Sequence, residues 1–141
     1  MKSVLISIQP KWCELIASGK KTVEVRKTKP KLDTPFKVYI YCTKSKKKTR
    51  IDWIDKALGG GMIIGEFVCD RISRIVIYDG CIVDVVDCKT SCLSAKEIIE
   101  YSGGDPLYGW HISGLEIYDT AKELSGFGLS RAPQSWCYVE V

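Results

Sequence analysis

Three charged residues near the N-terminus, Lys21, Glu24 and Arg26, could act together on one ligand. They follow a predicted turn and lie at the start of a predicted strand. Successive side chains of a strand point to opposite faces, so Glu24 and Arg26 share one face while Val23 and Val25 face a core. A carboxylate beside cations suits nucleotide binding or proton transfer. The alternative interpretation is a solvated strand face with a weak ion contact.

A short helix is expected to set the direction in which this charged stretch leaves the turn. The apolar segment 4–8 predicts a first strand, and Pro10 suits the first position of the following helix, where a missing N–H costs nothing. Gly19 is well placed to end that helix. Trp12 lies on the apolar face of the helix and is predicted to be a core residue.

Positive charge is concentrated around this stretch. Residues 1–50 hold 14 lysines and arginines against 3 acidic residues, a net charge of +11, whereas residues 51–141 hold 7 against 14, a net charge of −7. Lys44, Lys46 and Lys47 belong to a basic loop before residue 51. A local basic field attracts polyanions, so this loop is predicted either to grip nucleic acid or to be a solvated connection.

The segment before the basic loop alternates in polarity and predicts a strand over residues 36–43. Its Tyr39 and Tyr41 share a face and could stack on bases beside the lysines. The other possibility is that both rings cover a half-buried sheet face with their hydroxyls in water.

The rest of the chain predicts further strands and short helices. A short helix is expected within 51–58, and the long β-like stretch 62–78 contains Gly65, a candidate bulge. Asp79-Gly80 signals a two-residue hairpin. Ser94 opens a capping box for a helix that ends near residue 103, and Thr120 is predicted to start another helix. A turn is expected over 105–108, an extended segment over 111–118 and a final strand over 136–141.

This layout predicts a single domain, residues 1–141, of the mainly β (α+β) class, in which a small mixed β-barrel carries short peripheral helices. No apolar run is long enough for a membrane span or a signal peptide, so a cytoplasmic location without membrane association is expected. The seven cysteines, an odd number, suit reduced thiols. Their spacing matches no zinc module, so no metal and no cofactor is predicted.

The charged stretch also resembles a known family signature. Gly19, Lys21, Glu24 and Arg26 spell G-x-K-x-x-E-x-R, which is similar to the signature of the ASCH domain family of the PUA-like superfamily. The segment 133–139, P-Q-S-W-C-Y-V, and the segment 64–67, I-G-E-F, also resemble parts of bacterial and phage ASCH-like proteins. The resemblance spans about residues 3–139 and implies a PUA-like barrel.

The resemblance implies a cleft beside the signature that binds RNA or a nucleotide. Arg26 and Lys21 would hold phosphate or a base edge, and Glu24 would accept a hydrogen bond from an exocyclic amine or a ribose hydroxyl. The predicted ligand-binding residues are Lys21, Glu24, Arg26, Tyr41, Lys44, Lys46, Lys47, Ser135 and Trp136.

Two other classes of function stay open. In the first, the same cleft is a hydrolase acting on RNA or on a nucleoside, with Lys21 and Glu24 as catalytic residues. One ASCH subgroup deacylates acetylated cytidine with a lysine and a threonine three residues later, and here Glu24 stands at the threonine position. A ribonuclease would lack a histidine pair, because His111 is the only histidine. In the second class, the apolar segment 62–83 serves as a protein-interaction surface.

Overall fold

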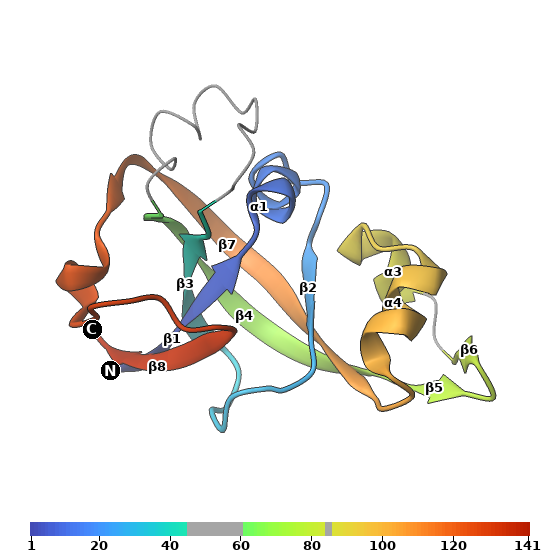
Figure 1. Ribbon diagram of the computed structural model, residues 1–141. Helices are drawn as coiled ribbons and strands as arrows, with labels where there is room; N and C mark the ends of the chain where they lie inside the picture. Colours follow the sequence, from blue (N-terminus) through green and yellow to red (C-terminus); the bar gives the residue numbers. More distant parts are fainter. Residues whose placement is uncertain (45–60, 84–85) are drawn as a thin grey trace.

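A computed structural model describes residues 1–44, 61–83 and 86–141, with the side chains of 86–88 left out. One long mixed sheet dominates these residues, and short helices lie at its periphery (Figure 1). The strands are β1 (Lys2–Ile8), β2 (Val23–Arg26), β3 (Phe36–Cys42), β4 (Ile63–Ile75), β5 (Ile77–Tyr78), β6 (Cys81–Ile82), β7 (Leu107–Lys122) and β8 (Trp136–Glu140). The helices are α1 (Pro10–Ala17), α3 (Val86–Ser91), α4 (Ala95–Ser102) and the 3-10 helix η1 (Leu124–Phe127).

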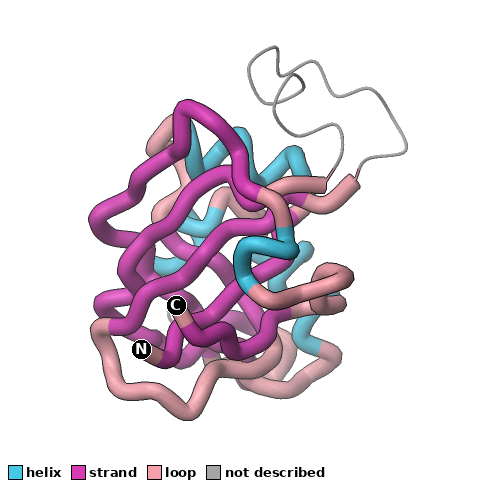
Figure 2. The backbone as a smooth tube through the Cα atoms, turned by 90° about the vertical axis from the view of Figure 1, so that its left-hand side faces the viewer, coloured by secondary structure: helices cyan, strands magenta, loops and turns pink. Residues whose placement is uncertain are grey.

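The sheet has six strands in the order β2-β7-β4-β3-β1-β8, and β5 and β6 pair separately. Only β1 and β3 run parallel, while every other adjacent pair is antiparallel. The mainly β α+β class is therefore confirmed. The closed barrel is wrong for the part of the chain that is described, because β2 and β8 end the sheet without pairing with each other (Figure 1). Figure 2 shows the strands from the side, with the helices around them.

Both faces of the sheet are covered around β1 and β3, so nearly every residue of these two strands is buried. On one face, Val38, Ile40 and Phe67 pack against Cys13 and Ile16 of α1. On the other face, a second cluster contains Leu5, Tyr39 and Tyr41, with partly buried residues of η1 packed on it. Tyr39 and Tyr41 are only 6% and 7% exposed, so this sheet face is more deeply buried than the half-buried face that the sequence predicted.

A third hydrophobic cluster attaches helix α4 to the edge strand β2. Val23 and Val25 pack against Ile98 of α4 and Leu107 of β7. The capping box that begins α4 is confirmed: the Ser94 hydroxyl accepts from the Glu97 amide, and the Glu97 carboxylate accepts from the Ser94 amide. This cluster and this cap together fix α4 beside the charged stretch.

Glycine decides two local features of the long strands. A Cβ added at Gly65 would lie 2.4 Å from the Glu116 carbonyl oxygen, and the β4–β7 register shifts beside it, so the predicted bulge is confirmed. The Asp79-Gly80 hairpin is also confirmed, with φ of 50° and 72° at its two turn residues.

The region after α4 differs from the prediction. Strand β7 runs from Leu107 to Lys122, so it includes half of the expected turn and the expected helix start at Thr120. Pairing with β4 extends as far as Lys122 opposite Ile63, and this ladder outweighs the local helix signal. A single 3-10 turn, η1, follows instead. The helix expected within 51–58 lies outside the described residues.

None of the helices in the described ranges is long and apolar enough to cross a membrane.

Candidate nucleotide-binding cleft

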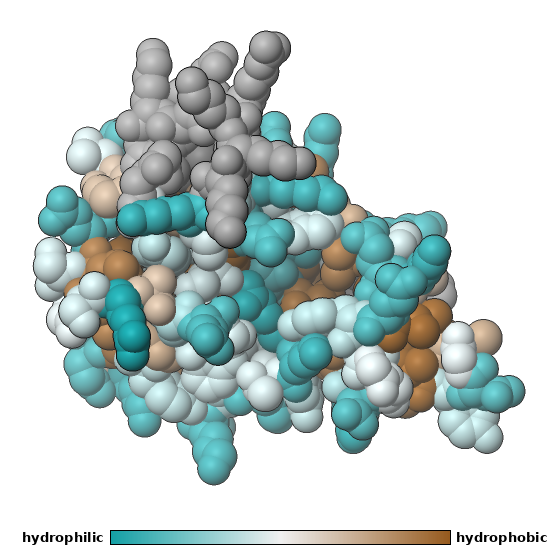
Figure 3. Space-filling model, viewed as in Figure 1, coloured by the Kyte–Doolittle hydropathy of each residue, from teal (hydrophilic) through white to brown (hydrophobic). Residues whose placement is uncertain are grey.

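A cleft of about 460 Å³ opens beside β2, between α1 and α4. The surface is hollowed here, and hydrophobic side chains show between hydrophilic ones (Figure 3). Its lining residues come from three places. The β1–α1 region and the end of β3 provide Ser7, Gln9, Trp12 and Thr43. The charged stretch provides Lys21, Glu24, Val25 and Arg26, and later parts of the chain provide Leu93, Glu97, Tyr101 and Gln134.

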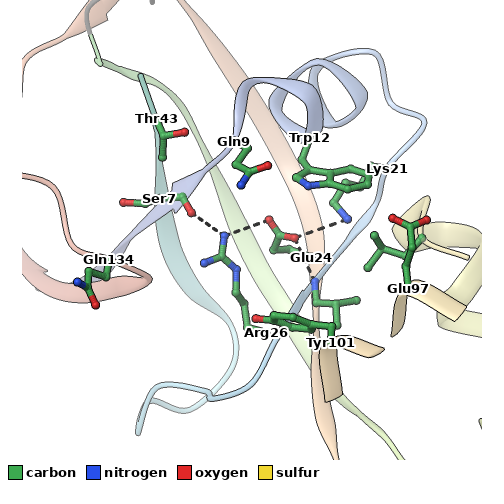
Figure 4. A pocket seen from close by; sticks show the side chains of 12 residues that line it. Ser7, Gln9, Trp12, Lys21, Glu24, Arg26, Thr43, Glu97, Tyr101 and Gln134 are labelled. Atoms are coloured by element: carbon green, nitrogen blue, oxygen red, sulfur yellow. Dashed lines mark hydrogen bonds and ion pairs between the residues drawn. The ribbon is translucent and has the colours of Figure 1, made fainter. Parts of the chain in front are cut away.

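The charged stretch reaches this cleft by the local route that the sequence predicted. Gly19 follows α1 with a φ of 81°, the left-handed conformation that ends a helix and turns the chain. The next residues enter β2, where Val23 and Val25 are buried in the third core cluster. The alternating side chains of Glu24 and Arg26 therefore point into the cleft (Figure 4).

Glu24 lies between two cations at the floor of the cleft. Its Oε1 is 3.6 Å from the Lys21 ammonium, and its Oε2 is 3.4 Å from Nη2 of Arg26. Lys21 and Glu24 are 1% and 5% exposed. A buried charge is costly unless it is paired, so each of the three side chains depends on the others.

Further hydrogen bonds tie the two cations to distant backbone. The Lys21 ammonium donates to the carbonyl oxygen of Ser91, at the end of α3. The Arg26 guanidinium donates to the Ser7 carbonyl oxygen at 2.6 Å and to the Ser135 hydroxyl at 3.2 Å. Arg26 thus links β2 to β1 and to the segment before β8. The three charges are fixed in position before any ligand arrives.

Burial lowers the pKa of Lys21, although the neighbouring Glu24 carboxylate opposes this change. At the rim, the pKa of Glu97 is lowered because its carboxylate accepts the Ser94 backbone amide. The cleft therefore holds two carboxylates and two cationic side chains, all with a hydrogen-bonding role.

Two aromatic rings form walls above and below the charged floor (Figure 4). The Lys21 ammonium lies 5.0 Å from the centre of the Trp12 ring, within cation–π range. Tyr101 projects from α4 on the other side, is 40% exposed, and has a pKa that burial raises. A flat ligand could contact both rings while its edge meets Glu24.

The family model of the ASCH domain matches residues 6–123 of the chain. The chain belongs to the ASCH domain family. No curated protein matches its sequence. This ASCH domain is similar in fold to the crystal structure of ASCH from Zymomonas mobilis, with a TM-score of 0.71, 20% identity, and coverage of 98% of this chain and 87% of that chain.

Two variants of the Zymomonas mobilis protein are similar as well. A tyrosine-to-phenylalanine variant gives a TM-score of 0.69 at 20% identity, covering 99% of this chain and 91% of that one. A serine-to-alanine variant gives 0.67 at 19% identity, covering 98% and 88%. At this identity the likeness concerns the fold, which is the PUA-like α+β fold of ASCH domains.

The other predicted site residues of this ASCH domain lie at different distances from the cleft. Ser135 contacts Arg26 but does not line the cleft. Lys44 is exposed next to the lining residue Thr43. Lys46 and Lys47 lie outside the described residues.

Two predicted stacking residues are not brought to the cleft. Tyr41 is 7% exposed and lies in the second core cluster, on the other face of the sheet, because the alternation of β3 turns it away. The Trp136 ring packs against Trp110 and Tyr138, and its indole N–H donates to the Thr28 hydroxyl at 2.9 Å.

Aromatic walls come instead from Trp12, predicted as core, and Tyr101, which the sequence did not single out. The helical position of Trp12 beside the signature was a usable signal. Tyr101 had none, because the packing of α4 on β2 places it.

Among residues 1–44, 61–83 and 86–141, no group of three or more His, Cys, Asp or Glu side chains is placed to hold a metal ion.

Proposed function

We propose that this ASCH domain binds RNA, or a free nucleotide, with one nucleotide in the cleft beside Glu24. ASCH domains are of the nucleic-acid-binding type. The observation that carries the proposal is a carboxylate held between two cations at the floor of a hollow with aromatic walls. The volume of about 460 Å³ lies in the range of small-ligand sites.

Each group in the cleft suits one part of a nucleotide. The Glu24 carboxylate can accept a hydrogen bond from an exocyclic amine or a ribose hydroxyl, since an ionised carboxylate has several acceptor positions. Arg26 has five N–H donors and can offer those not used by Ser7, Glu24 and Ser135 to a base edge or phosphate. Trp12 and Tyr101 supply faces on which a base can stack.

A hydrolase is the second candidate, and one observation favours it. Lys21 has a lowered pKa and lies 3.6 Å from the Glu24 carboxylate, a combination that occurs at catalytic sites. Incubation of the protein with acetylated cytidine and with labelled RNA separates an enzyme from a reader. Unchanged substrates in the presence of binding would reject the catalytic role.

The binding proposal is tested by titration at low salt. Nucleotides are followed by calorimetry, and short labelled single-stranded RNAs by fluorescence anisotropy. Tyr101→Ala should weaken binding about tenfold, since stacking on an aromatic ring contributes about 1–3 kcal/mol per base. Glu24→Gln should change which bases are preferred, because an amide both donates and accepts hydrogen bonds.

Matched controls are available outside the cleft. Tyr78→Ala removes a tyrosine that is 76% exposed on the β5–β6 hairpin, and Glu100→Gln neutralises an exposed carboxylate on α4. Both should bind like the unchanged protein. The proposal is wrong if no RNA or nucleotide binds at low salt, or if Tyr78→Ala weakens binding as much as Tyr101→Ala. In the second case the hairpin, and not the cleft, would contact the RNA.

A further inference from the structure

A second pocket, of about 470 Å³, lies where η1 meets the sheet, with its Tyr39 wall on the sheet face opposite α1. Tyr39 of β3 and Glu66 of β4 form one wall, and they are directly opposite each other in the ladder. The pocket is also lined by Lys122 and Glu123, at the end of β7, and by Phe127 of η1. Neither the charged stretch nor any residue of the nucleotide cleft lines this pocket.

An ionised carboxylate is fixed in its wall. Glu66 Oε2 lies 2.6 Å from the Lys37 ammonium, and Oε1 accepts the Tyr118 hydroxyl at 2.9 Å. Burial alone would raise the pKa of Glu66, but these two hydrogen bonds outweigh it and lower the pKa. A carboxylate held in this way still has lone pairs for a further donor.

Tyr39 brings a phenolic hydroxyl group to this pocket. The residue is 6% exposed, yet its hydroxyl makes no hydrogen bond with any described residue. No fully enclosed side-chain polar atom among the described residues lacks a hydrogen bond, so this hydroxyl is not fully enclosed, and Tyr39 lines the pocket. Burial raises the pKa of Tyr39, so the oxygen stays a neutral acceptor and donor at pH 7.

The second pocket is already lined by one ammonium group, that of Lys122. Lys122 Nζ lies 4.2 Å from the centre of the Tyr118 ring, a cation–π contact. Two more carboxylates stand nearby: Glu116 is opposite Glu66 in the β4–β7 ladder, and Glu123 lines the pocket. Three carboxylates against Lys37 and Lys122 leave a net negative charge beside aromatic rings, which favours a cation.

We propose that this pocket binds a primary ammonium group, with the Tyr39 hydroxyl, Glu66 and Glu123 as its hydrogen-bond acceptors. A primary ammonium has three donors in a compact arrangement, which matches three acceptors around one hollow. The Lys122 ammonium is a built-in competitor for this charge. The shared chemistry could come from a free polyamine or from a lysine side chain of another protein. The proposal does not depend on the nucleotide cleft.

The test uses the whole chain with three ammonium probes and one neutral control, and it follows the shifts of the backbone amide resonances of residues 124–128. Butylammonium should shift them saturably, whereas its neutral counterpart butan-1-ol should not. Spermidine and Nα-acetyl-lysine methylamide, titrated in parallel, tell which source fits better: tighter spermidine binding indicates a polyamine, and tighter lysine-derivative binding indicates a protein side chain.

Four variants make the test specific. Tyr39→Phe keeps the ring, removes the hydroxyl and should weaken butylammonium binding about tenfold, the expected effect of one hydrogen bond to a charged group. Tyr41→Phe is its matched control, since Tyr41 is equally buried in the same strand and cluster but does not line the pocket. Glu123→Gln, an exposed change, should also weaken binding. Lys122→Gln should tighten it, because the competing cation is gone.

Absence of a saturable shift with butylammonium would overturn the proposal, as would an equal response to butan-1-ol or unchanged binding by both Tyr39→Phe and Glu123→Gln. Glu24→Gln should leave ammonium binding as it is. Failure of nucleotide binding in the cleft therefore has no bearing on this result, and the two proposals can fail separately.

Discussion

Lys21 is the least exposed charged side chain among the described residues. It shows that the charged side chains of the cleft pair with one another inside the protein. Its ammonium reaches the Ser91 carbonyl and the Glu24 carboxylate, yet burial still lowers its pKa. Burial of an ammonium without full compensation costs stability. Burial of the Lys21 ammonium in the cleft therefore lowers the free energy of unfolding of the protein.

This cost predicts a particular dependence of stability on pH. The folded pKa of Lys21 lies below its ordinary value of 10.5, so between these two values the unfolded chain binds more protons. The contribution of Lys21 to the free energy of unfolding must therefore increase as the pH rises toward 10.5. The difference in unfolding free energy between the unchanged protein and Lys21→Met, measured by denaturant titration from pH 7 to 10.5, should increase. A flat or falling difference would contradict the buried, charged lysine.

The types of the charged residues could be read from the sequence, but their partners could not. Alternation along 22–26 was enough to place Glu24 and Arg26 on one face. The bonds from Arg26 to Ser7 and Ser135 join residues 19 and 109 positions away, and no local pattern encodes such pairs. The same limit applies to Tyr101, which long-range packing places over the charged stretch.

At the scale of elements, α4 is the part that completes the cleft, and its N-terminal cap holds it in place. Ser94→Ala removes the side-chain acceptor for the Glu97 amide and should cost about 1 kcal/mol of unfolding free energy. Because Glu97 and Tyr101 lie on α4, nucleotide affinity should fall with it.

Thermal unfolding and RNA titration of the same samples check this prediction. Ser130→Ala, an exposed change in the segment before β8, is the control and should alter neither quantity. Loss of stability with unchanged affinity would mean that α4 positions nothing in the cleft.

Elements with strong local signals were predictable. The Ser94 capping box and the Asp79-Gly80 turn are short-range devices, and both are confirmed. Thr120 shows the opposite case, since an equally local helix signal is overruled by pairing between β7 and β4. Closure of the sheet was expected from the order of the elements and from the family resemblance, whereas the actual edges, β2 and β8, depend on which strands pair with each other.

At the scale of the whole molecule, charge is divided between the two parts of the sequence, and the cleft is built mainly from the basic part. Double reversal of Lys46 and Lys47 to Glu lowers the net charge of +4 by 4 units. Affinity should fall by a similar factor for RNAs of different sequence, and the salt dependence should flatten, because phosphate contacts release counterions.

Anisotropy titrations over a range of salt concentrations measure both quantities. Reversal of Lys89 and Lys96 makes the same change in net charge within the acidic part of the chain, and both lysines are exposed. If the two double variants behave alike, overall charge governs the attraction. If only the Lys46/Lys47 pair matters, the basic segment contacts RNA directly.

Strand β3 separates two core clusters that face opposite ways. Val38 and Ile40 pack on the side of α1, whereas Tyr39 and Tyr41 pack on the side of η1, where Tyr39 borders the second pocket. An insertion of one residue within β3 would exchange these two sets of side chains beyond the insertion. The packing under α1 and the wall of the η1 pocket would then be lost in a single step, so the spacing of this strand is constrained from two sides at once.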